Sequence, residues 1–97
     1  DGPSAGITMA TAMVSAMKNV PVRSDIAMTG EISIRGKVMP IGGLKEKVLA
    51  AKRAGVKKII IPVENAPDLE EIPEYGKENI EFVLAEQMND VLSNSLV

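Results

Sequence analysis

Ser4 is the residue whose surroundings most favour chemistry in this sequence. It lies in Asp1-Gly2-Pro3-Ser4-Ala5-Gly6, a run of small residues that leads into a predicted helix. Backbone N–H groups at a helix N-terminus are unpaired and carry partial positive charge, so a serine there has donors nearby for a developing oxyanion. The simpler interpretation is that Ser4 only caps the helix, because serine is among the commonest capping residues.

The composition limits which groups could assist such a nucleophile. The 97 residues contain no histidine and no cysteine. A Ser-His-Asp triad, a thiol nucleophile, disulfides and thiolate metal sites are therefore excluded within this chain. The candidate nucleophiles are serine, threonine and lysine, and the candidate bases are lysine, aspartate and glutamate.

Lys47 is the lysine best placed to act as a base. In the helix predicted over Leu44–Ala54, a stripe of apolar and small residues forms at about 100° per residue, and its members are Leu44, Val48, Ala51 and Gly55. Lys47 borders this stripe, about 60° from Leu44, whereas Lys45 and Lys52 are predicted to face solvent. Burial disfavours the charged form of an amine, and a lysine with a lowered pKa can accept a proton from a serine hydroxyl. The alternative is a lysine whose stem covers apolar surface while its ammonium group reaches water.

Thr29 is a candidate for a supporting role. It is a polar residue in a predicted strand with apolar neighbours, so its hydroxyl could hydrogen-bond a buried amine. The alternative is that Thr29 is simply a good strand former.

Three further patterns have structural explanations. Gly30 to Lys37 has five residues rather than four between its glycines, and Val38 stands where a phosphate-binding loop needs Ser or Thr, so a hairpin is favoured. The acidic residues Glu64, Asp68, Glu70, Glu71 and Glu74 lack the alternation and central glycine of a calcium loop and predict a solvated loop. The four-residue spacing of Met9, Met13 and Met17 predicts filling of the core or of a subunit interface.

Periodicity and punctuation predict the elements that must position these residues. A helix is predicted over about Ala5–Met17, with Ile7, Ala10, Val14 and Met17 at helical spacing. Strands over Ile26–Ile34 and Val38–Ile41 form a predicted hairpin, turned at Arg35-Gly36-Lys37. Pro40 places the second strand at a sheet edge or at a strand end.

The second half of the chain adds the helix that contains Lys47 and a buried strand. Gly42-Gly43 precede that helix and Gly55 follows its end. Lys58–Pro62 is predicted to be a short strand buried on both faces. The remaining predicted elements are a short helix and loop over 64–74, a strand over Ile80–Leu84 and a closing helix over Met88–Leu96. This order indicates an α+β or α/β fold without internal repeats.

The overall composition is that of a folded domain or part of one. Hydrophobic residues make up 45% and charged residues 25%, with a net charge of −2, which argues against disorder and does not favour a nucleic-acid or anionic-membrane partner. The single Tyr75, the single Phe82 and the absence of tryptophan disfavour stacking platforms for nucleic acid. No apolar stretch approaches the length of a membrane span.

Taken together, the motifs resemble the proteolytic domain of bacterial-type Lon proteases over nearly the whole chain. Each motif is weak alone, and their combination is specific. The segments that carry the resemblance are Asp1–Ile7, Pro21-Val22-Arg23, Ala27–Ile32, Arg35-Gly36, Pro40–Lys47, Ile61-Pro62, Glu64-Asn65 and Asp68–Pro73.

The resemblance implies a serine endopeptidase with a Ser-Lys dyad. Ser4 matches the family's nucleophile, Lys47 its catalytic lysine, and Thr29 a threonine near that lysine. Lys47 would accept the Ser4 hydroxyl proton, Ser4 would form an acyl-enzyme, and Lys47 would protonate the leaving amine. The implied fold is α+β with two layers, similar to a domain of a small-subunit ribosomal protein.

The resemblance also implies partners outside this segment. Members of the family degrade damaged, misfolded and short-lived regulatory proteins, in protein quality control and the stress response. They form a ring, usually a hexamer, and an ATPase module of the same polypeptide unfolds the substrates. ATP and magnesium are expected in that module, and no cofactor or metal in this segment. The expected location is the bacterial cytoplasm rather than an organelle matrix, with no membrane or nucleic-acid partner.

Residues 1–97 are expected to be the C-terminal part of the proteolytic domain, a piece that begins just before Ser4 and lacks the upstream strands of the family's sheet. Two other classes of function stay open. One is a non-catalytic structural or interaction module of the same fold. The other is a nucleotide-binding module, which the failed phosphate-loop match disfavours.

Overall fold

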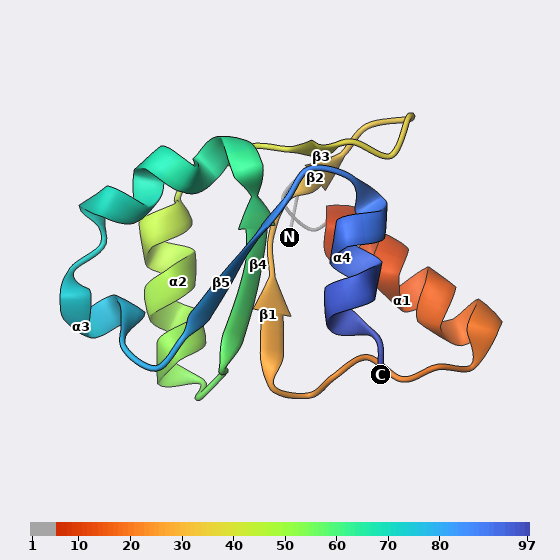
Figure 1. The fold of residues 1–97 in the computed structure, drawn as a ribbon, viewed down its shortest axis with the longest axis horizontal. Coiled ribbons are helices and arrows are strands. Elements are labelled where there is room, and N and C mark those ends of the chain that lie inside the picture. The colour runs from red at the N-terminus through yellow and green to blue at the C-terminus, as the bar shows by residue number, and fades with distance from the viewer. Residues whose placement is uncertain (1–5) are drawn as a thin grey trace.

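A three-stranded parallel sheet organises the chain, with helices on either side of it (Figure 1). The structure is a computed structural model that describes residues 6–97. The elements in chain order are α1 (Gly6–Lys18), β1 (Ile26–Met28), β2 (Glu31–Ile32), β3 (Val38–Met39), α2 (Leu44–Arg53), β4 (Lys58–Pro62), a 3₁₀ helix η2 (Val63–Glu71), α3 (Glu74–Lys77), β5 (Glu81–Ala85) and α4 (Met88–Ser95).

Strand β4 lies in the centre of the sheet. Its residue Ile60 pairs with Met28 of β1 on one side and with Val83 of β5 on the other, and both pairings are parallel. Ile59, Ile60 and Ile61 are all buried. The prediction of a short apolar strand buried on both faces is therefore confirmed, since helices cover both sides of β4.

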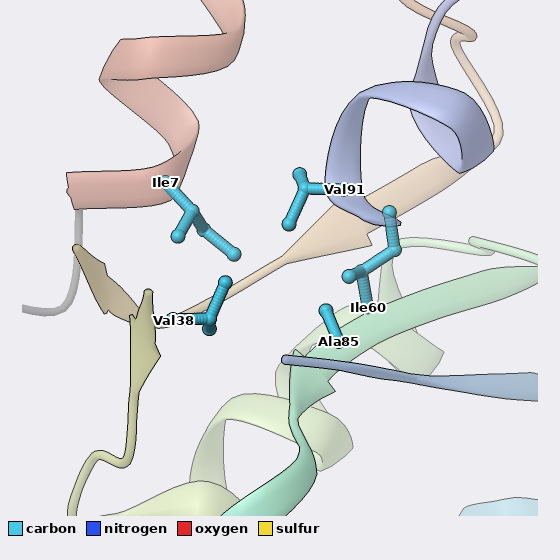
Figure 2. Packing of buried hydrophobic residues seen from close by; sticks show 5 residues of the cluster. All are labelled: Ile7, Val38, Ile60, Ala85 and Val91. Carbon is cyan, nitrogen blue, oxygen red and sulfur yellow. The ribbon is translucent and has the colours of Figure 1, made fainter. Parts of the chain in front are cut away.

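The alternation of side chains along β4 creates two cores. Ile60 points to the side of α1 and α4, where it packs with Ile7, Val38, Ala85 and Val91 (Figure 2). Ile59 and Ile61 point to the opposite side, where they pack with Leu44 and Val48 of α2 and with Ile72. The α+β class is confirmed, but the described residues form three layers rather than two, because both faces of the sheet are covered (Figure 1). The similarity to a ribosomal-protein domain stays a prediction.

The single strand predicted over Ile26–Ile34 is divided into two strands that belong to different sheets. Thr29 still donates its N–H to the carbonyl of Ile60, at 3.1 Å. Gly30 then adopts a φ of 151°, and a Cβ added there would lie 3.2 Å from Pro62 Cγ and from Val38 Cγ1. Only glycine fits this buried bend, and beyond it the chain leaves the parallel sheet.

The predicted hairpin is confirmed, though with shorter strands. Glu31 of β2 pairs antiparallel with Met39 of β3, and Ser33 and Lys37 close the turn through a 2.9 Å backbone hydrogen bond. Strand β3 ends before Pro40, which has no N–H to donate. Because this segment is a hairpin, the phosphate-loop alternative has no structural support.

The methionines of α1 lie on its outer surface. Met9, Met13 and Met17 are 65%, 64% and 83% exposed, whereas the buried residues of α1 are Ile7 and Thr11. Filling of this core by the methionines was therefore a wrong prediction. The alternative, that they fill a subunit interface, stays a prediction.

The last residues of the chain pair with the segment that follows α1. Val22 and Leu96 form an antiparallel bridge, flanked by hydrogen bonds from Arg23 N to Ser95 O at 2.8 Å and from Val97 N to Pro21 O at 3.0 Å. Helices α1 and α4 lie on the same side of the sheet, where Ile7 and Val91 belong to one core cluster (Figure 1). The layer on this side therefore joins elements from the two ends of the sequence.

Candidate active site

Helix α2 places Lys47 beside the sheet. Leu44 and Val48 are buried against Ile59 and Ile61 of β4, and Ala51 packs at the edge of the same cluster. These residues form the predicted apolar stripe, although Gly55 is exposed. Lys47 precedes Val48, is exposed, and lines a pocket between α2 and the sheet.

Thr29 also lines that pocket. It follows β1 directly, is only 7% exposed, and is held to β4 by its hydrogen bond to Ile60. Together, Lys47 and Thr29 line a small cavity of about 40 Å³, whose other lining residues are Ala27, Met28, Val48, Ala51 and Ile59. The exposed Lys47 and the buried Thr29 thus line one small cavity whose other lining residues are apolar.

The neighbouring lysines lie elsewhere. Lys45 lines a larger cavity of about 370 Å³ at the start of α2, together with Gly42, Gly43, Asp68 and Glu71 among others, and none of the predicted site residues. Lys52 is half-buried, and its Nζ donates to the carbonyl of Glu78 at 3.1 Å, so its predicted exposure to solvent was wrong. Only Lys47 of these three lysines shares a cavity with Thr29.

Ser4 lies outside the described residues, so its role as a nucleophile, its capping role and its oxyanion donors stay predictions. The helix that follows it in the chain is held near Thr29. Ile7 donates its N–H to the carbonyl of Gly30 at 3.1 Å. At Gly6, a Cβ would lie 3.0 Å from the backbone nitrogen of Ile32, so the start of α1 touches β2 closely. The first turn of α1 therefore lies directly beside Gly30, the residue that follows Thr29.

The short helix predicted within 64–74 is present as η2, and the acidic residues Glu64, Glu70, Glu71 and Glu74 are exposed, as predicted. The segment 63–74 forms η2 and the first residue of α3, and Asn65 within it is only 2% exposed. Asn65 is a residue whose role the sequence reasoning missed, although an amide shortly after a buried strand is a signal for a buried polar contact. Within residues 6–97, no three acidic side chains come together as a candidate metal site.

In the described part of the chain, none of the helices has the length and apolar character needed to cross a membrane.

Comparison with known proteins identifies the family. The family model for the Lon protease (S16) C-terminal proteolytic domain matches residues 1–97, the whole chain. The chain belongs to this family. Curated relatives named Lon protease support the assignment: the chain is 61% identical over 97 residues to that of Bacillus thuringiensis (strain Al Hakam) and 60% identical over 97 residues to that of Syntrophomonas wolfei subsp. wolfei. A Lon protease of Geobacter metallireducens is 62% identical over 96 residues.

The matches cover all or nearly all of this chain but only a small part of each relative. The chain is covered to 100% by the Bacillus and Syntrophomonas proteins and to 99% by the Geobacter protein, and it spans 12% of the length of each. The resemblance found from the motifs is therefore confirmed. Its assignment to the C-terminal part of the Lon proteolytic domain, and the roles of individual residues, stay predictions.

Proposed function

We propose that this chain supplies the nucleophile and the general base of an ATP-dependent serine endopeptidase of the Lon type, namely Ser4 and Lys47. The observation that supports it best is the shared cavity of Lys47 and Thr29, in a chain whose whole length matches a proteolytic-domain family.

The proposed reaction is acyl transfer. Lys47 Nζ, in its neutral form, accepts the Ser4 hydroxyl proton as the serine oxygen attacks the scissile carbonyl. When the tetrahedral intermediate collapses, the C–N bond breaks and Lys47 gives the proton to the leaving amine. The acyl-enzyme is then hydrolysed by a water that Lys47 deprotonates. In this scheme Thr29 orients the lysine amine through its hydroxyl.

The proposal for the parent protein goes further than this segment. The parent would be a ring-forming peptidase, in the expected case a hexamer in the bacterial cytoplasm, that degrades damaged and short-lived proteins as part of the stress response. Its ATPase module would bind ATP and magnesium outside this chain. Family membership supports these statements, and the row of exposed methionines on α1 offers an apolar surface for subunit contacts.

A matched pair of lysine variants tests the dyad. In the parent protein, Lys47→Gln is expected to lower ATP-supported hydrolysis of a fluorogenic peptide by more than about 10³-fold, because the general base is lost. Lys45→Gln is the control, since Lys45 is exposed on the same helix and lines a different cavity. Its turnover is expected to stay within about twofold of the wild type.

Circular dichroism and ring assembly are compared for all three proteins, so that loss of folding is separated from loss of chemistry. Turnover by Lys47→Gln at the level of Lys45→Gln would show that Lys47 is an ordinary surface lysine. The non-catalytic module of the same fold would then be the better description.

A further inference from the structure

The helix that carries Lys47 begins without a side-chain cap. Gly43 occupies the N-cap position with a φ of 73°, and glycine has no side chain that could bond the first N–H groups. Gly42 precedes it, and within the described residues no atom would lie within 4 Å of a Cβ at Gly42. The carbonyl of Gly43 accepts from Lys47 N–H at 3.3 Å, but neither glycine has a side chain that could anchor the start of the helix.

The side chain of Asn65 instead holds the backbone at Ile41, the residue before Gly42. Its Oδ1 accepts from the N–H of Ile41 at 2.9 Å, and its Nδ2 donates to the carbonyl of Ile41 at 2.9 Å. The second hydrogen of Nδ2 is donated to Asp68 Oδ2 at 2.7 Å, which fixes the orientation of the amide. Asn65 is 2% exposed, so water does not compete for these hydrogen bonds.

These contacts relate α2 to the strand that already holds Thr29. Asn65 lies in η2, which follows β4 without a break, and Thr29 is bonded to Ile60 of β4. Thr29 and Asn65, which holds the segment before α2, are thus both attached directly to β4. Apolar packing of Leu44 and Val48 holds α2 against the sheet, but such contacts are not directional, whereas hydrogen bonds are.

We infer that Asn65 is a positioning residue for Lys47: by bonding both polar groups of Ile41 it sets the position of α2 along the sheet, and so the reach of Lys47 toward its partner. This inference rests on the proposed Ser4–Lys47 function. A displacement of about 1 Å in a catalytic group can cost about 10²-fold in rate, so loss of the Asn65 contacts affects the chemical step more than substrate binding.

The test uses the parent protein with Asn65→Ala, Asn65→Asp and the control Asp68→Asn. Asn65→Asp keeps an acceptor for Ile41 N–H and loses both donated hydrogen bonds, while Asp68→Asn keeps an acceptor for Asn65 Nδ2. The two Asn65 variants are expected to lose about 10- to 100-fold in kcat with KM within about twofold. Asp68→Asn is expected to retain wild-type kcat.

The measured readout is kcat per folded active site, with the sites counted by a serine-directed acylating inhibitor and Tm recorded for each variant. A purely structural Asn65 would lower Tm and leave kcat per site unchanged, and that result would overturn the inference. If Asn65→Ala does not fold, Asp68→Ala is measured in its place, because it removes one of the three hydrogen bonds of the Asn65 side chain. Its kcat is expected to fall about 3- to 10-fold at constant KM, and an unchanged kcat contradicts the inference.

Lys47→Gln is measured alongside, so that the two proposals can fail separately. An active Lys47→Gln contradicts the proposed dyad, and with it any positioning of that dyad. An inactive Lys47→Gln together with fully active Asn65 variants contradicts only the role of Asn65.

Discussion

Thr29 serves the sheet through its backbone and the cavity through its side chain. Its N–H extends the pairing of β1 with β4, while the residue lines the cavity that Lys47 also lines. Substitutions that keep the backbone and change only the hydroxyl therefore separate strand formation from the proposed supporting role. Valine also favours strands, so it tests the alternative that Thr29 is simply a good strand former.

Thr29→Val is expected to lower kcat for peptide hydrolysis by about tenfold, which is roughly the effect of one lost hydrogen bond. Thr29→Ser keeps the hydroxyl and is expected to stay close to the wild type. Peptidase assays of both variants in the parent protein, with Tm as a check on folding, make the comparison. Equal activity of the valine and serine variants would leave Thr29 as a strand former only.

Individual residues differ in how far the sequence reveals them. Lys47 could be selected over Lys45 because helical periodicity alone decides which lysine borders the apolar stripe. Asn65 could not be selected, because its partner Ile41 lies 24 positions away in the sequence and no local pattern records that contact. The exposure of Met13 was missed for a related reason: periodicity shows that a row of methionines shares a face, not what covers it.

The start of α4 is defined by a capping box between Gln87 and Asp90. One oxygen of Asp90, Oδ2, accepts from the N–H groups of Gln87 and Glu86, each at 3.0 Å. These backbone hydrogen bonds, from Gln87 first and then from Glu86, hold the pKa of Asp90 below its ordinary value. A carboxyl with a lowered pKa stabilises the folded state above its unfolded pKa, and this contribution is lost as the pH falls through the folded pKa.

Asp90→Asn is therefore expected to destabilise the chain at pH 7 and to have little effect at strongly acidic pH. The loss at pH 7 is expected to be about 0.5 kcal/mol, the low end for a helix cap, because solvent screens this carboxylate. Urea unfolding followed by circular dichroism at pH 7 and near pH 2.5 measures the difference between variant and wild type. A difference that does not change with pH would contradict the capping role of the carboxylate.

Helices α1, α2 and α4 and strand β4 were predictable to within about two residues, whereas α3 and the strand over 26–34 were not. Local signals define the helices, as in the apolar stripe of α2 and the glycine after its end. Strand pairing depends on distant partners, and periodicity does not show that Ala27 pairs with Ile59 while Ile32 pairs with Val38. From the sequence alone, Gly30 is an ordinary glycine within a strand, because its close approach to Pro62 depends on the fold.

Ile60 lies in the middle strand of the parallel sheet and in one of the two cores of the described chain. It is fully buried, pairs with strands on both sides, and packs with residues from α1, β3, β5 and α4 (Figure 2). Its side chain therefore has few ways to be replaced without leaving a cavity.

Ile60→Ala is expected to lower the free energy of unfolding by about 2–5 kcal/mol, since the cavity it leaves is lined by rigid elements. Ile34→Ala is the matched control, because Ile34 is fully exposed in the hairpin turn. Its effect is expected to lie within about 0.5 kcal/mol. Urea denaturation of the two variants measures both values, and similar losses for the two would contradict the central role of Ile60.

The pairing of α1 with the last residues of the chain has a consequence for the order in which the protein is made. Ile7 meets Val91 in one core, and the segment after α1 is bonded to Leu96 and Val97. A ribosome adds about 5–20 residues per second, so the roughly 80 residues between these partners take roughly 4–16 s to synthesise. During that time α1 can already pack against β2, but α4, which completes its layer, has not been made. The core that joins Ile7 of α1 to Val91 of α4 can therefore close only after α4 has been synthesised, several seconds after α1.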